Sequence, residues 1–135
     1  MRSQKTYKVQ AFSLIELMIV VAIAAVLSTI AVPSYLTSIQ KSRRSDAINA
    51  LLATQRAYEL SYAQNSSYII SPPALPSDTV YYNYTVVSAT NTYTLRATAP
   101  AGSAQASDAQ GAIACNVLNI DNINNKTPQE CWNAL

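Results

Sequence analysis

The feature that most constrains this chain is an apolar stretch near its start, AFSLIELMIVVAIAAVLSTIAVP, at residues 11–33. From Leu14 to Val32 its only polar residues are Glu16, Ser28 and Thr29. A helix over that range would be roughly 28 Å long, close to the hydrocarbon thickness of a bilayer. A carboxylate inside such a segment is costly, so we expect Glu16 to have a function and a partner.

Two common kinds of segment share part of this pattern. A secretory signal would use the basic residues Arg2, Lys5 and Lys8 and would be cut after the apolar run. This run exceeds the usual length of about 7–15 residues, and Glu16 would lie inside it. A plain single-pass anchor fits the length. It leaves Glu16 without a role.

The residues around Phe12 resemble the class III signal of type IV pilins and their relatives, in which the cut precedes the apolar run. The resemblance implies cleavage between Ala11 and Phe12, although the family usually has glycine where this chain has Ala11. It also implies N-methylation of Phe12. The family uses the carboxylate at the position of Glu16 to attract the terminal amine of a neighbouring subunit during assembly.

Composition argues against several classes of protein. The net charge of the 135 residues is +2, but removing the three basic residues of positions 1–11 leaves six basic against seven acidic residues. The chain contains no histidine, which removes the commonest general base and metal ligand. No glycine-rich phosphate loop or nucleophile–base set is present either. We therefore predict that the chain is not an enzyme and has no cofactor, no metal and no catalytic residues.

Helical periodicity continues beyond Pro33. Residues from Ser34 to about Ala63 include no glycine or proline. One apolar face recurs at steps of three and four residues, through Ile48, Leu51, Gln55, Tyr58 and Tyr62, with Leu52 beside it. We expect one long helix, apolar all round at first and amphipathic later. Arg43 and Arg44 are predicted to form a solvated collar near the membrane; the alternative is contact with neighbouring subunits or lipid headgroups.

The remaining residues have the pattern of a small β-sheet. Asn65–Ser77 is predicted to be a loop, because Pro72, Pro73 and Pro76 exclude a helix. Three strands are expected, at Val80–Val87, Thr92–Ala99 and Ala112–Ile120, with a flexible loop over Pro100–Gly111. The sequence thus predicts an α+β fold, in which the long helix packs on a small antiparallel sheet.

Cys115 and Cys131 are the only cysteines. A disulfide between them would contribute about 3 kcal/mol in the loop-entropy model and favours an oxidising compartment. A metal pair or a catalytic thiol would lack histidine partners. The pair also resembles the disulfide that closes the C-terminal loop in type IV pilins, and we expect neighbouring Trp132 to pack against that closure.

Three weaker patterns occur in the same region. Oxygen ligands cluster at Asp121, Asn122, Asn124 and Asn125, but a single carboxylate without a turn glycine argues against calcium. Asn65, Asn83 and Asn125 begin short glycosylation motifs that often arise by chance. Residues 65–135 hold two basic residues against four acidic ones, so no direct contact with nucleic acid is predicted.

The segments Arg43–Tyr68 and Lys126–Trp132 resemble small minor pilins of the PilE type. The resemblance implies a leader at 1–11, an apolar transmembrane and assembly helix at 12–33, an amphipathic half-helix at 34–64 and a globular part at 65–135. It implies a subunit of a type IV pilus that contributes to pilus assembly, adhesion or twitching motility.

The expected partners are other pilin subunits in a helical filament, the prepilin peptidase and methyltransferase, the inner membrane and the assembly platform. Such a protein lies in the bacterial inner membrane before assembly and in the extracellular pilus afterwards. The alternatives are a type II secretion pseudopilin and a DNA-uptake pilin.

Overall fold

The computed structural model describes residues 12–133, which divide after Leu36 into two units. Helix α1 (Leu14–Asn65, 52 residues) runs through both units. The prediction of one long helix is confirmed. Pro33 lies inside it, and the helix continues through this position. The absence of glycine, and of any proline but Pro33, over this range agrees with an uninterrupted helix.

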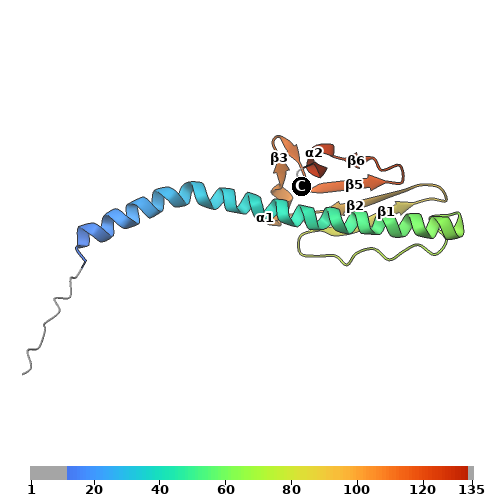
Figure 1. Cartoon of the computed structure of the whole chain (residues 1–135), viewed down its shortest axis with the longest axis horizontal. Coiled ribbons are helices and arrows are strands. Elements are labelled where there is room, and N and C mark those ends of the chain that lie inside the picture. Colours follow the sequence, from blue (N-terminus) through green and yellow to red (C-terminus); the bar gives the residue numbers. More distant parts are fainter. Residues whose placement is uncertain (1–11, 134–135) are drawn as a thin grey trace, which may run out of the picture. The chain divides into compact units, whose positions relative to one another are not determined.

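The second unit, which we call the head, begins at Thr37 and contains a four-stranded antiparallel sheet (Figure 1). Its strands are β1 (Asn83–Ser88), β2 (Tyr93–Thr98), β5 (Val117–Asp121) and β6 (Lys126–Thr127), in that spatial order. A two-stranded sheet of β3 (Ala109–Gln110) and β4 (Ile113–Ala114) and the short helix α2 (Gln129–Trp132) complete it.

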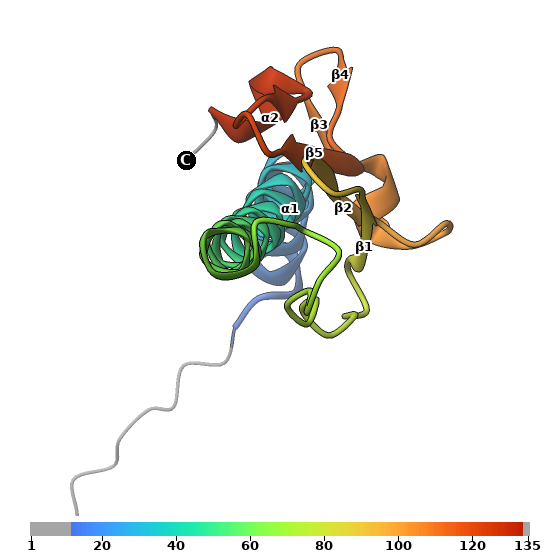
Figure 2. The ribbon, with the colours of Figure 1, turned by 90° about the vertical axis from the view of Figure 1, so that its right-hand side faces the viewer.

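The hydrophobic core lies between the sheet and the part of α1 that belongs to the head (Figure 2). Ile48, Leu51 and Tyr58 of α1 are buried, as the predicted apolar face requires. In β2 every second residue from Tyr93 to Ala97 is buried, which confirms the predicted alternation. The predicted α+β fold is therefore confirmed.

Two predictions about the segment after β2 are wrong. The supposed flexible loop over Pro100–Gly111 contains a 3₁₀ helix, η1 (Ala104–Ser107), and strand β3. The supposed single strand over Ala112–Ile120 is two strands, β4 and β5. The first segment is held by side-chain contacts to α1 that no local pattern reveals, such as those of Arg44 with Asp108 and Gln110. The second segment divides at residues 115–116, because β4 pairs with β3 whereas β5 pairs with β2.

The first strand also starts later than predicted, at Asn83 instead of Val80. Residues ahead of it form a tight turn in which the Thr79 N–H donates to the Tyr82 carbonyl at 2.9 Å. The Thr79 hydroxyl oxygen accepts the Tyr82 N–H at 2.9 Å. Local hydrogen bonds of a threonine thus override the β propensity of Val80 and Tyr81.

Candidate assembly helix and the contacts of the head

Residues 12–38 all present exposed side chains in this single chain, and most of them are apolar. Phe12 is 79% exposed and Ile30 is 74% exposed. By length and composition α1 is able to cross a membrane. Ser28 and Thr29 donate their hydroxyl protons to the carbonyls of Ala24 and Val26, each at 2.7 Å. Hydroxyl groups satisfied in this way suit apolar surroundings, where an unpaired donor is costly.

Glu16 lies in the first turn of α1 and is exposed. The carbonyl of Ser13 accepts the N–H groups of Glu16 and Leu17, at 3.1 and 3.3 Å, and so begins the helix. A carboxylate at this end is favoured by the helix dipole. Phe12 precedes the helix, and Ala11 lies outside the described residues. Cleavage at Ala11–Phe12 and methylation of Phe12 therefore stay predictions.

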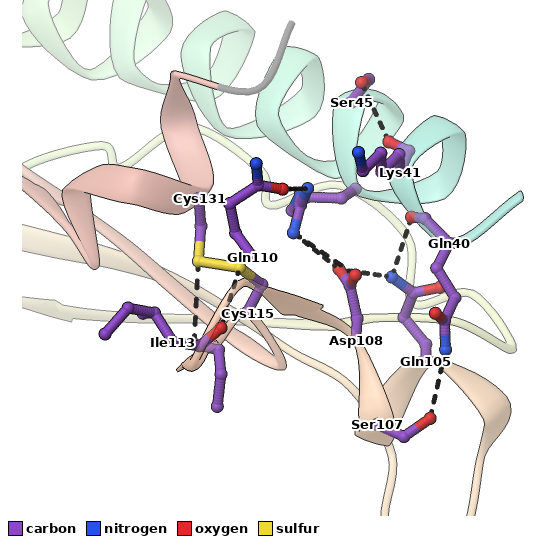
Figure 3. A network of polar contacts seen from close by, with 12 residues as sticks. Gln40, Lys41, Ser45, Gln105, Ser107, Asp108, Gln110, Ile113, Cys115 and Cys131 are labelled. Atoms are coloured by element: carbon purple, nitrogen blue, oxygen red, sulfur yellow. Dashed lines mark hydrogen bonds and ion pairs between the residues drawn. A yellow bond between two sulfur atoms is a disulfide. The ribbon is translucent and has the colours of Figure 1, made fainter. Parts of the chain in front are cut away.

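The prediction of a solvated collar is wrong for Arg44, which is 1% exposed. Its Nη1 lies 3.3 Å from Oδ2 of Asp108, itself 1% exposed, and its Nη2 donates to Oε1 of Gln110 at 3.2 Å. Figure 3 shows Asp108 and Gln110 of the η1–β3 segment facing the part of α1 that carries Gln40 and Lys41. The sequence alone does not reveal this pair, because the two residues are far apart along the chain and each occurs in a polar context.

Gln105 completes this buried network. Its Nε2 donates to Asp108 Oδ2 at 3.0 Å and to the Tyr82 hydroxyl at 3.0 Å. Gln40 Nε2 donates to the Ala104 carbonyl at 2.6 Å. Burial raises the pKa of the Asp108 carboxyl above its ordinary value and outweighs the opposing attraction of Arg44. The network explains why the segment predicted to be flexible is ordered.

Arg43 is only partly exposed, because its guanidinium carbon lies 3.9 Å from the centre of the Tyr81 ring. This is a cation–π contact, of about 0.5–1 kcal/mol at exposed sites. It connects α1 to the loop ahead of β1. Neither arginine therefore forms the predicted solvated collar, since both side chains make contacts within the head.

A tyrosine cluster surrounds Glu59 at the far end of α1. The Glu59 carboxylate accepts hydrogen bonds from the hydroxyls of Tyr93, at 2.7 Å, and Tyr68, at 3.1 Å. The Tyr68 ring lies 4.4 Å from that of Tyr62 and 4.7 Å from that of Tyr93. Burial, together with Glu59, raises the pKa of Tyr68 to about 12 and raises that of Tyr93 as well. The cluster fastens the loop after α1 to the helix and to β2.

The disulfide between Cys115 and Cys131 is present, as predicted. Both cysteines are fully buried, and the bond joins α2 to the segment between β4 and β5. Trp132 is buried beside it, which confirms its packing role, and Lys126 Nζ lies 5.5 Å from the centre of the Trp132 ring. The predicted closure of the C-terminal region is therefore confirmed.

The carboxylate of Asp121 closes the turn between β5 and β6. Its Oδ1 accepts the N–H groups of Ile123 and Asn125, at 3.1 and 2.8 Å. Asn124 in this turn has a positive φ of 61°, a conformation that asparagine tolerates well. Over residues 12–133 no group of three histidine, cysteine or acidic side chains is placed to hold a metal ion.

Comparison with known families identifies this architecture. Residues 33–119 match the family model described as type IV minor pilin ComP, DNA uptake sequence receptor. The chain belongs to this family of type IV minor pilins. Residues 7–32 match the prokaryotic N-terminal methylation motif, which overlaps the apolar stretch and Glu16. No curated protein sequence matches the chain.

A solved pilin shares the fold. The structure of a type IV pilin from Shewanella oneidensis is 21% identical in sequence, with a TM-score of 0.53. The match covers 67% of this chain and 92% of that chain. At this identity the likeness concerns the fold alone. The pilin is thus a structural subunit of the type IV pilus, anchored in the inner membrane by its apolar helix and then carried to the cell surface.

Proposed function

We propose that this minor pilin enters the pilus through its apolar helix, with Glu16 as the group that fixes its position, and that it has no catalytic role. The supporting observation is an exposed apolar helix that carries one carboxylate in its first turn. Such a surface must be covered by lipid before assembly and by other subunits afterwards. Apolar helices alone pack with little preference for axial offset, so a polar group is needed to specify register.

Processing supplies the partner of that carboxylate in this proposal. Cleavage between Ala11 and Phe12 frees an α-amino group four residues, or about one helical turn, from Glu16. Neither charge is stable alone in hydrocarbon, and pairing offsets part of the desolvation of each. When the amine belongs to the neighbouring subunit, one buried ion pair selects a single axial offset between two helices.

The test compares the amount of this pilin in sheared filaments with the amount in membranes. We expect Glu16→Ala to leave the head folded and the protein in the membrane but to lower this ratio strongly. Glu16→Gln should also lower it, because the amide keeps the shape and loses the charge. Ile15→Ala, at an adjacent exposed position, is the matched control. An unchanged ratio for Glu16→Ala would refute the assembly role.

Maturation is tested separately by N-terminal sequencing of the assembled protein. A sequence beginning at Phe12, with a methylated amine, is the expected result. A sequence beginning after the apolar run would instead show an ordinary secretory signal. An intact leader in the filament would show a simple anchor, and either result would remove the amine on which the proposed pairing depends.

A second candidate function is DNA reception, favoured by the match of residues 33–119 to a family described as a DNA uptake sequence receptor. The charge of the head gives it little support, since residues 37–133 carry six basic and six acidic residues. Arg44 is buried in an ion pair, whereas Arg96 is exposed on the outer face of the sheet. Lys126 is partly exposed.

Binding of the full chain in detergent micelles to duplex DNA at several salt concentrations tests this second role. The affinity of a receptor for DNA should fall as the salt concentration rises. In Arg96→Gln and in Lys126→Gln, the slope of log affinity against log salt concentration should become shallower by about one, because each variant removes one phosphate contact. Lys41→Gln is the control for a loss of charge elsewhere. Absence of binding at low salt would agree with the sequence prediction of no direct nucleic-acid contact.

A further inference from the structure

We propose that a polar cavity at the C-terminal side of the head binds an acidic sugar of monosaccharide size. The cavity has a volume of about 300 Å³ and is lined by Asn124, Asn125, Lys126, Gln129, Trp132 and Asn133. This volume is at the lower end of the range of small-molecule sites, about 300–1,000 Å³. The lining residues come from the β5–β6 turn, strand β6, helix α2 and the residue after it.

The chemistry of the wall selects the class of ligand. Four carboxamides and one ammonium group surround the cavity, and no carboxylate is among the lining residues. Each carboxamide offers both a donor and an acceptor, which matches the paired hydroxyls of a sugar. A phosphate would use only the donors. The single ammonium of Lys126 matches one carboxylate on the ligand.

The carboxamides that line the cavity make no side-chain hydrogen bonds elsewhere in the head. Across residues 12–133, no hydrogen bond of the structure involves the side-chain amides of Asn124, Asn125, Gln129 or Asn133. Trp132 is only 7% exposed, and its indole Nε1 is a buried donor without a partner among the described residues. A donor covered in this way does not face the cavity, so the polar groups that a ligand can reach are the four carboxamides and the Lys126 ammonium.

The frame of the cavity is held in place by contacts of several kinds. The Cys115–Cys131 disulfide fixes α2, and the Asp121 carboxylate fixes the turn that carries Asn124 and Asn125. Lys126 Nζ is positioned 5.5 Å from the centre of the Trp132 ring. A site ordered before binding loses less entropy when the ligand arrives.

The single tryptophan of the chain makes a direct test possible. The full chain in detergent micelles is titrated with galacturonate while the fluorescence of Trp132 is followed. We expect a saturable change with a Kd on the order of 1 mM. Galactose and inorganic phosphate should bind about tenfold more weakly or worse, since each lacks one of the two features that the wall recognises.

Variants separate the two features. Lys126→Gln should weaken galacturonate about tenfold and leave galactose unchanged. Gln129→Glu, at an exposed position, should also lower the affinity for galacturonate, because its carboxylate repels the carboxylate of the ligand in the cavity. Lys41→Gln, the same loss of charge on α1, should change neither. Three outcomes would overturn the proposal: no saturable response to galacturonate, an equal response to phosphate or to galactose, or a response to single-stranded DNA alone.

Discussion

The apolar side chains of helix α1 have opposite environments in residues 12–36 and in the head. In the first region the apolar side chains are exposed, as at Ile19, which is 54% exposed. In the head, Ile48 of the same helix is 2% exposed because the sheet covers it. The head therefore supplies its own core. The first region depends on lipid or on other subunits for its burial.

Polar groups differ between the two regions in the same way. Ser28 and Thr29 are satisfied by the carbonyl groups of their own helix, within four residues. Arg44 is satisfied by Asp108, 64 residues away. The two hydroxyls of the apolar region are satisfied within their own helix, so they need no particular neighbour. The Arg44–Asp108 pair joins distant segments of the chain and so stabilises one folded arrangement of the head.

The largest effect is expected from breaking the buried pair in the head. Arg44→Ala leaves the Asp108 carboxylate buried without its counter-ion, so the free energy of unfolding should fall by about 3–5 kcal/mol. Urea denaturation of the full chain in detergent, followed by Trp132 fluorescence, measures it. Arg56→Ala, at an exposed position of the same helix, should change the stability by about 0.5 kcal/mol or less.

The double variant Arg44→Leu/Asp108→Leu sharpens this prediction. Replacing both charges by apolar groups removes the desolvation cost as well as the attraction, so much of the stability should return. A single variant as stable as the wild type would mean that solvent reaches Asp108 readily.

The next effect compares matched isoleucines in the two regions. Ile48→Ala should lower the free energy of unfolding of the head by about 2–5 kcal/mol, because it leaves a cavity in the core. Ile19→Ala removes the same atoms from an exposed face and should leave that free energy unchanged. Equal losses for both variants would show that residues 12–36 contribute to the stability of the head.

The smallest effect concerns alkaline pH. An unfolded tyrosine loses its proton near pH 10, whereas Tyr68 in the head has a pKa raised to about 12. The folded state therefore binds more protons between these values, and stability falls as the pH rises above about 10. Tyr68→Phe should make this fall less steep in urea denaturation at a series of pH values. Tyr35→Phe, whose side chain is exposed, should not; an equal change in both would contradict the role of the Glu59 cluster.

Much of the molecule could be predicted from local patterns. The long helix, the buried alternation of β2 and the disulfide follow from residue spacing and composition or from the resemblance to pilins. The segment from Pro100 to Cys115 could not be predicted. Its small and polar residues indicate a loop, and only contact with α1 gives Gln105 and Asp108 buried positions. The same holds for Arg44, whose charge predicts exposure when its partner is not known.

The sequence by itself determined that Leu14–Val32 is an apolar helix bearing a carboxylate, because hydrophobic length and charge are properties of consecutive residues. It also determined the face of α1 that meets the sheet, since helical period places Ile48, Leu51 and Tyr58 together. Only the tertiary structure decided which polar groups are buried. Burying a charge is favourable only beside a specific partner, and Arg44 meets Asp108 only after the chain has folded.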